Sequence, residues 1–260
     1  MNNKEVLKQI RSNILEIAFK SNEGHIPSSF SILELIYVYY DIRLKQELDG
    51  VKINDKLIVS KGHAALGIFS ILNHFGLLGK DSLDSFSSFF SPYGGHPDST
   101  KVAEIEVSTG SLGHGLPIGV GMALASKIIS EKAKYFVLVG DGELNEGSNW
   151  EAILLAPEHL LDNLILIIDN NHSGDRAIKL PGLKDKLCSF GWDTIEIDGH
   201  SLEDIYSAYM KAANPQNQRP LAIIANTIKG KGIVEMENSP EWHHQIPSEE
   251  KLQEWLKELK

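Results

Sequence analysis

Residues 140–171, GDGELNEGSNWEAILLAPEHLLDNLILIIDNN, begin and end with polar residues, and each of these two polar groups stands at the end of an apolar run. The apolar run 135–139 leads into Gly140-Asp141-Gly142, and the run 164–168 ends in Asp169-Asn170-Asn171. A helical segment separates the two runs, so the pattern predicts two parallel strands joined by a helix. The ends of these strands would present Asp141 and Asn171 at one edge of a sheet.

The residues at this edge suit a hard cation. An Asp carboxylate, an Asn amide oxygen and a nearby backbone carbonyl are ligands that Mg²⁺ accepts, and the ion keeps open positions for phosphate oxygens. The glycines beside Asp141 let the backbone approach a diphosphate closely. GDG and NN are each ordinary turn sequences, so the prediction of a metal–diphosphate site depends on their combination with the strands.

The composition narrows the class of protein. The 260 residues are 42% hydrophobic and carry a formal net charge of −10, which argues against nucleic-acid binding because phosphates attract clustered Lys and Arg. A single cysteine, Cys188, excludes an intrachain disulfide and suits a reducing compartment. The sequence has no apolar run of about 18 residues and no apolar signal core at its start. We expect a cytoplasmic protein without a membrane segment.

Strands alternate with helices along the chain. This order predicts an α/β fold in which helices flank a parallel β-sheet on both faces. We see no repeat or linker and expect one domain over residues 1–260. Helices are expected at 3–21, 31–40, 64–74, within 110–130 after a glycine-rich start, at 202–212 and from Ser248 onward. Further strands are expected at 57–60, 194–197 and 221–225, and a loop at 81–100.

Five histidines stand beside glycine or in loops that follow helices or strands. A single loop histidine is usually only solvated, but several across one α/β sheet indicate a site. Neutral histidines orient sugar hydroxyls and move protons near neutral pH. These histidines are His25, His63, His96, His114 and His243.

Several segments taken in order resemble the transketolase family, and most closely the N-terminal subunit of two-chain (split) transketolases. The segments are DKLIVSKGHAALG, GGHPDS, EVSTGSLGHGLPIGVGMALA, GDGELNEGSNWEA, LDNLILIIDNN, ANTIKGKG and MENSPEWHHQIP. The resemblance covers about residues 8–247. It implies the thiamine-diphosphate (ThDP) fold, with ThDP and Mg²⁺ as cofactors, and transfer of a two-carbon ketol unit between sugars. Ca²⁺ and Mn²⁺ would suit the same oxygen ligands.

The resemblance also implies roles for individual residues. Asp141, Asn171 and the carbonyl of Ser173 match the metal ligands. His25 and His96 match histidines that touch the donor hydroxyls. The implied catalytic residues are His25, His63, His96 and His243, and the implied cofactor-binding residues are His63, Gly110, Ser111, Leu112, Gly140, Asp141, Gly142, Glu146, Asn171 and His243. Among these, Glu146 matches a carboxylate in the acidic network between two ThDP sites.

The resemblance further implies a partner. The family carries the glutamate that activates ThDP, and most contacts to the sugar phosphate, in a second, pyrimidine-binding domain that would follow residue 260. We therefore expect this chain to be inactive alone and to pair with a C-terminal pyrimidine-binding subunit in an α2β2 heterotetramer. Its substrates would be sugars or sugar phosphates.

The chain departs from the family pattern near the donor histidines. Pro27 replaces a usual glycine, which predicts a differently shaped loop at His25. His114 replaces a glutamine, His172 and His244 replace glycines, and residues 172–180 differ throughout. Neutral drift is one explanation. An altered substrate, such as a nucleotide-linked or glycan-pathway sugar, is the other.

Other ThDP enzymes remain alternatives. Deoxyxylulose-phosphate synthase shares GDG and NN, and a 2-oxo-acid dehydrogenase subunit shares the metal motif. The segments VSKGHAA and MENSPEWHH favour transketolase over the synthase, and SKGH and GGHPDS would not be expected in the dehydrogenase subunit. A structural or regulatory pseudo-subunit is the non-enzyme alternative, but it would have no physical need for Asp141, Asn171 or the histidines.

Overall fold

The computed structural model describes residues 2–51, 54–213 and 217–260, and the chain forms two compact units. The helical unit comprises Met1–Tyr37, Gly62–Gly110 and Ile228–Lys260, and the sheet unit comprises Val38–Lys61 and Ser111–Thr227. Across the described ranges, no helix has both the length and the apolar character needed to cross a membrane.

Five parallel strands form the centre of the sheet unit, in the spatial order β1-β2-β3-β5-β4. They are β1 (Lys56–Val59), β2 (Tyr135–Gly140), β3 (Leu164–Asn170), β4 (Asp193–Asp198) and β5 (Leu221–Asn226). Strand β2 is buried throughout and β3 along all but its last residue. Burial on both faces explains why these strands read as continuous apolar runs. The predicted parallel sheet is confirmed.

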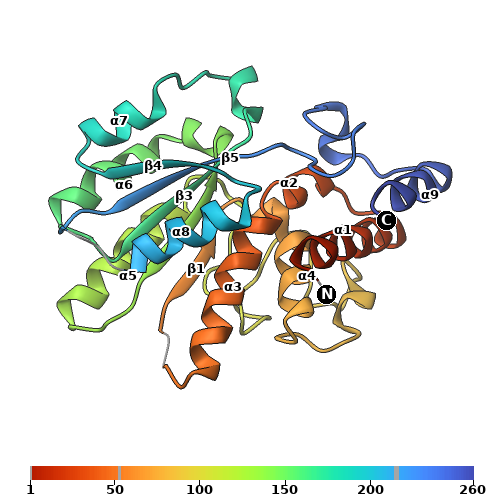
Figure 1. Ribbon diagram of the computed structural model, residues 1–260, viewed down its shortest axis with the longest axis horizontal. Coiled ribbons are helices and arrows are strands. Elements are labelled where there is room, and N and C mark those ends of the chain that lie inside the picture. The colour runs from red at the N-terminus through yellow and green to blue at the C-terminus, as the bar shows by residue number, and fades with distance from the viewer. Residues whose placement is uncertain (1, 52–53, 214–216) are drawn as a thin grey trace. The chain divides into compact units, whose positions relative to one another are not determined.

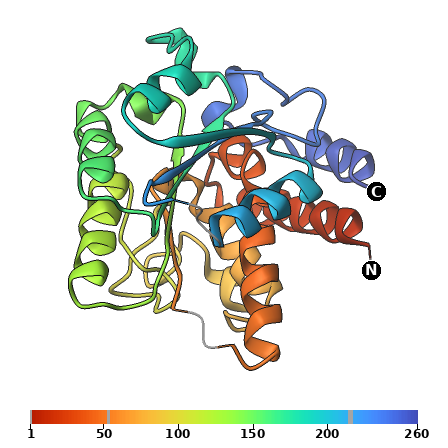
Figure 2. The ribbon, with the colours of Figure 1, turned by 60° about the vertical axis from the view of Figure 1, so that its left-hand side comes forward.

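Helices cover both faces of the sheet (Figure 1, Figure 2). α5 (Gly115–Ile128), α6 (Gly147–Glu158) and α7 (Leu183–Ser189) lie on one face, and α3 (Leu33–Leu48) and α8 (Leu202–Ala213) lie on the other. Crossovers between parallel strands are right-handed, so the reversal of direction from β4 to β5 places α8 opposite α5 to α7. The rings of Tyr39 in α3 and Tyr209 in α8 both pack against Phe136 of β2, at centroid distances of 5.3 and 5.5 Å.

The helical unit is organised around its first helix. It contains α1 (Asn3–Ser21), α2 (Ile26–Phe30), α4 (Ala65–His74) and α9 (Glu249–Glu258), with short 3-10 turns η1 (Gly62–Ala64), η2 (Ser82–Ser85) and η5 (Glu241–His244). α1 packs against α4 and α9. Its buried Arg11 forms an ion pair with Glu34 at 2.7 Å and donates to the carbonyl of Lys231 at 2.8 Å. These bonds tie distant parts of the sequence together.

Most predicted elements are confirmed, including the Ser248 cap, whose side chain accepts the N–H of Lys251 at 3.3 Å. Two helices were not predicted, and both are short. α2 has five residues and lies where the sequence predicted a loop shaped by Pro27; proline suits the first turn of a helix. α7 has seven residues, which is too few to show a helical period.

The packing of α5 on the sheet depends on Gly119. A Cβ at this position would lie 2.5 Å from Cγ2 of Val137, whereas a Cβ at Gly121 of the same helix would meet nothing within 4 Å. We predict that Gly119→Ala lowers the free energy of unfolding by about 1–3 kcal/mol through overpacking. Gly121→Ala should raise it by about 0.5–1 kcal/mol, because alanine loses less backbone entropy in a helix. Urea denaturation of both variants checks this, and equal midpoints would contradict it.

Candidate cofactor site

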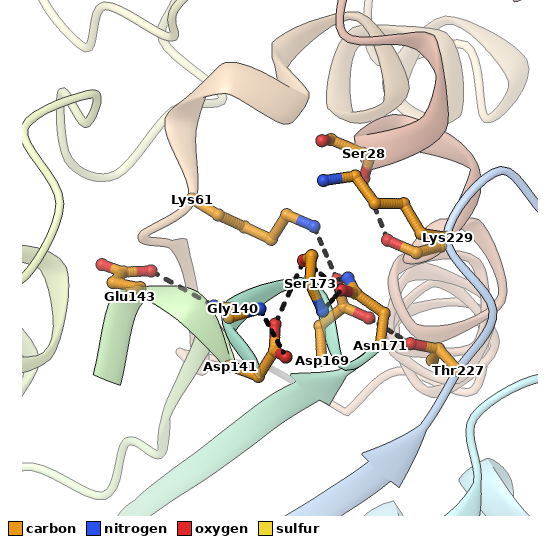
Figure 3. Close-up of polar contacts among 12 residues, drawn as sticks. Ser28, Lys61, Gly140, Asp141, Glu143, Asp169, Asn171, Ser173, Thr227 and Lys229 are labelled. Atoms are coloured by element: carbon orange, nitrogen blue, oxygen red, sulfur yellow. Dashed lines mark hydrogen bonds and ion pairs between the residues drawn. The ribbon is translucent and has the colours of Figure 1, made fainter. Parts of the chain in front are cut away.

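The predicted metal ligands lie together at the carboxyl edge of the sheet (Figure 3). Asp141 directly follows β2, and Asn171 directly follows β3. The backbone N–H of Ser173 donates to Oδ1 of Asn171 at 3.1 Å, and its hydroxyl donates to Oδ1 of Asp141 at 3.3 Å and also to Oδ1 of Asn171. The hydroxyl of Ser173 therefore links the two predicted ligand oxygens, a role that the sequence did not indicate.

This group of side chains fits a divalent cation. Burial raises the pKa of Asp141, and the neighbouring Asp169 raises it further, against hydrogen bonds from the N–H groups of Gly174 and Gly142 that lower it. The buried carboxylate thus lacks full compensation for its negative charge. A hard cation would supply that compensation, and the carboxylate and amide oxygens are its preferred ligands.

Two glycines bring the backbone segments of this cluster into contact. A Cβ on Gly174 would lie 2.6 Å from the Cα of Gly142, which is closer than folded proteins allow. The N–H of Gly174 also donates to Oδ2 of Asp141 at 3.1 Å. Glycine at position 174 therefore lets the turn after β3 lie directly on the turn after β2.

A buried ion pair orients the cluster, and the sequence pattern did not predict it. Nζ of Lys61 lies 2.5 Å from Oδ2 of Asp169, and the two side chains are 3% and 0% exposed. Asp169 also accepts the hydroxyl of Thr227 and, at 2.8 Å, the amide of Asn171 (Figure 3). Because Nδ2 of Asn171 is bound by Asp169, its Oδ1 faces Ser173 and Asp141. The only available signal was the position of Asp169 at the end of an apolar run.

A second buried acid, Glu143, fixes the neighbouring loops. Its carboxylate accepts the N–H of Gly113 at 2.9 Å, the N–H of Gly140 at 3.2 Å and the hydroxyl of Ser60. Burial raises the pKa of Glu143, and these three hydrogen bonds and Lys61 act against that rise. The sequence motif predicted a role for Glu146 and not for Glu143. Both acids lie in one polar turn, so the local sequence could not distinguish the buried acid from the exposed one.

Part of the predicted cofactor loop lies beside Glu146. Gly113 has φ of +82°, and a Cβ there would lie 2.6 Å from the Cβ of Glu146. The hydroxyl of Ser148 donates to the carbonyl of Gly113 at 2.7 Å. Ser111 and Glu146 are exposed, and Leu112 is half-buried. The predicted residues of the sheet unit, from Ser111 to Ser173, are thus placed around its strand ends.

The four predicted catalytic histidines all belong to the helical unit. The ring of His25 lies 5.2 Å from that of His63 and 5.5 Å from that of His243. His243 Nδ1 lies 2.8 Å from Nζ of Lys229. A Cβ at Gly110 would lie 2.8 Å from Cδ2 of His96, so Gly110 leaves room for that ring.

Burial and neighbouring positive charge lower the pKa of His25 to about 4. Burial contributes most, followed by His244, His243, His96 and Lys229. His25 is therefore neutral at pH 7 and can both donate and accept hydrogen bonds. Pro27 lies in the first turn of α2, and His25 precedes that helix with φ of 70°.

A cavity of about 420 Å³ opens beside the strand ends of the sheet unit. Its lining includes Asp141, Asn170, Asn226 and much of the segment 172–185. Nδ2 of Asn170 donates to Oδ1 of Asn226 at 2.8 Å. The residues after Asn171 that differ from the family pattern therefore form one wall of a cavity next to the predicted metal ligands.

Comparisons with known proteins agree on one family. The model of the transketolase thiamine diphosphate-binding domain matches residues 2–259. An apulose-4-phosphate transketolase subunit of Phocaeicola vulgatus is 37% identical over 256 residues, which cover 96% of this chain and 90% of the relative. The protein of the same name from Actinobacillus succinogenes is 38% identical over 266 residues, covering 97% and 94%.

A solved transketolase from Pichia stipitis superimposes with a TM-score of 0.86 at 25% identity. The match covers 99% of this chain and 40% of the solved one. The chain thus spans about two fifths of the length of that transketolase, whereas it spans nearly all of the two apulose-4-phosphate transketolase subunits.

The hydrogen bonds of Glu143 yield a stability prediction. Glu143→Ala leaves two buried N–H groups and the hydroxyl of Ser60 without their acceptor, and each lost bond costs about 1–3 kcal/mol. We expect the free energy of unfolding to fall by about 3 kcal/mol or more. Glu151→Ala, at an exposed position in α6, should change it by less than about 0.5 kcal/mol. Urea denaturation measures both, and a loss at Glu143 no larger than at Glu151 would refute the role.

The low pKa of His25 yields a pH prediction. Its value of about 4 in the folded protein lies below the ordinary 6.5, so the unfolded chain binds more protons between these values. Stability contributed by the neutral ring is complete above pH 6.5 and is lost as the pH falls towards 4. His25→Asn, which tolerates the left-handed backbone, should flatten the dependence of unfolding free energy on pH in this window. Exposed His159→Asn is the control, and identical slopes for wild type and His25→Asn would count against the assignment.

Proposed function

Because this chain belongs to the transketolase family through its thiamine-diphosphate-binding domain, we propose that it is the diphosphate-binding subunit of a two-chain transketolase. The observation that carries the proposal is the cluster of Asp141, Asn171 and Ser173, oriented by the buried Lys61–Asp169 pair. Such a cluster suits a cation, because a buried carboxylate such as Asp141, whose hydrogen-bond donors are uncharged, is costly to stability. We further propose that residues 1–260 act as one cofactor-binding domain.

We assign the metal to the sheet unit. Asp141 and Asn171 would hold Mg²⁺ through side-chain oxygens, and Ser173 would add its carbonyl. Ca²⁺ or Mn²⁺ would satisfy the same ligands. Gly140 and Gly142 would lie against the diphosphate, with Ser111, Leu112 and Glu146 completing the contacts from this unit. The cofactor contacts that we propose for the helical unit are Gly110, His63 and His243.

ThDP, when bound, supplies the nucleophilic carbon and the electron sink for ketol transfer. The protein's own residues bind, orient and move protons. The neutral ring of His25 offers one nitrogen that can accept a proton from a donor hydroxyl, and its low pKa favours return of that proton at pH 7. We propose the same class of role for His96, and contacts to both diphosphate and donor for His243.

We propose that the partner is a separate pyrimidine-binding subunit, in an α2β2 assembly. Both bacterial relatives are named as one subunit of a transketolase, which implies a second. Helices α5 and α6 and the residues that follow them also expose large apolar side chains, as expected for surface that a partner covers. These are Ile118, Ile128, Ile129, Leu154, Leu155 and Leu160, which are 40–74% exposed. The exposed free thiol of Cys188 suits the cytoplasmic location that we propose.

We propose sugar phosphates as substrates, because the two bacterial relatives are named for apulose 4-phosphate. The departures at Pro27, His114, His172 and His244 support a donor other than the ordinary pentose phosphates. Comparing kcat/KM for apulose 4-phosphate with that for a pentose phosphate tests this specificity. Full efficiency with the pentose phosphate would remove the reason for an altered substrate.

The proposed reaction has a direct test. We expect no ketol transfer by the purified chain with ThDP and Mg²⁺, and turnover after its pyrimidine-binding subunit is added. Asp141→Asn should reduce kcat at limiting Mg²⁺ by about 100-fold or more, since loss of outer partners alone costs about 10–100-fold. Asp84→Asn, at an exposed carboxylate 3.7 Å from Lys20, should leave the rate unchanged. Robust turnover by the chain alone would overturn the two-subunit proposal.

A further inference from the structure

A second cluster of metal-ligating side chains lies in the helical unit. Glu23, His25 and His244 each offer one ligand atom, and these three atoms lie within 4.8 Å of one another. We propose that these residues form a binding site for a divalent transition metal, specifically Zn²⁺. The site differs from the oxygen cluster of the sheet unit in both its residues and its chemistry.

The backbone brings the three ligands together. Gly24, between two of them, packs so closely on His244 that a Cβ there would lie 3.1 Å from the backbone carbon of that residue. His25 has φ of 70°, a left-handed conformation that turns the chain directly after Gly24. The rings of His25 and His244 then lie at a centroid distance of 4.4 Å.

The carboxylate of Glu23 is held next to the two rings. Its Oε1 lies 3.9 Å from Nε2 of His244. The hydroxyl of Ser87 donates to Oε2 at 3.5 Å, and a Cβ at Gly95 would lie 3.2 Å from Oε1. Small movements of these side chains bring three ligand atoms to the separations of a tetrahedral metal site, with the fourth position open.

The ligand types select the metal. Two imidazoles and one carboxylate suit Zn²⁺ and related first-row ions, whereas Mg²⁺ prefers oxygen ligands. A metal ligand must be a neutral imidazole, and most ordinary histidine side chains are neutral at pH 7. Glu23 and His25 are half-buried and His244 is exposed, so an ion can reach the site from solvent.

The consequence for catalysis rests on the proposed function. His25 is the residue that we place against the donor hydroxyl, and it cannot bind Zn²⁺ and a hydroxyl through the same nitrogen. Zn²⁺ would therefore inhibit ketol transfer without displacing Mg²⁺. His244, which stands where the family usually has glycine, is the ligand that makes this inhibition specific to this chain.

Binding is tested directly on the full chain, without the partner or any substrate. Calorimetric titration with Zn²⁺ in excess Mg²⁺ should show one saturable site, and Co²⁺ should give the intense visible absorption of a tetrahedral complex. Glu23→Gln and His244→Gly should each weaken Zn²⁺ binding by at least about tenfold. Asp141→Asn and exposed His159→Gln are matched controls that should bind Zn²⁺ as the wild type does.

The outcomes separate this site from the proposed function. Wild-type affinity in both Glu23→Gln and His244→Gly, or loss of the Zn²⁺ site in Asp141→Asn, would overturn the proposal. Circular dichroism of the metal-free variants checks folding, and if His244→Gly does not fold, Glu23→Gln decides alone. Loss of Zn²⁺ binding in the two variants supports the site even if no assembly of this chain transfers ketol units. In an active assembly, Zn²⁺ inhibition should be at least about tenfold weaker with His244→Gly.

Discussion

The buried Lys61–Asp169 ion pair is the interaction on which the cofactor edge of the sheet depends. Lys61 follows β1, Asp169 lies near the end of β3, and Thr227 follows β5, so one carboxylate joins the ends of three strands. A buried ion pair is favourable only when the remaining lone pairs are also bonded. Thr227 and Asn171 supply those bonds. The ion pair thus holds Asp169 in place, and Asp169 in turn orients the amide of Asn171 so that its oxygen faces Asp141.

The sequence predicted the fold well because the fold follows from the periodicity of apolar residues. The strands β2 and β3 are continuous apolar runs, and the residues after them carry the predicted ligands. Periodicity could not show α2 or α7, since neither completes enough turns. Nor could it show that Lys61 and Asp169 meet, because a buried ion pair between residues 108 positions apart leaves no local pattern.

The predicted metal ligands lie together in the structure, whereas the residues that orient them were not predicted. Asp141, Asn171 and Ser173 come together as expected, and so do the histidines of the helical unit. Glu143 was overlooked because an acid in a glycine-rich turn is usually solvated, yet here it is 2% exposed. The residues that position a site are recognised by their burial, and the burial of a side chain is known only from the folded structure. The ligands themselves face the same edge in any parallel sheet of this pattern.

The contact between Gly142 and Gly174 restricts how this protein can change over evolutionary time. The turn after β2 occupies the space that a side chain on Gly174 would need, since a Cβ there would reach within 2.8 Å of the nitrogen of Gly142. The exposed positions around Gly174, from His172 to Lys179, carry no such restriction. Substitutions in this segment can therefore change the wall of the neighbouring cavity while the backbone of the turn beside Asp141 stays the same. The lining of the cavity and the geometry of the predicted metal ligands can in this way change separately.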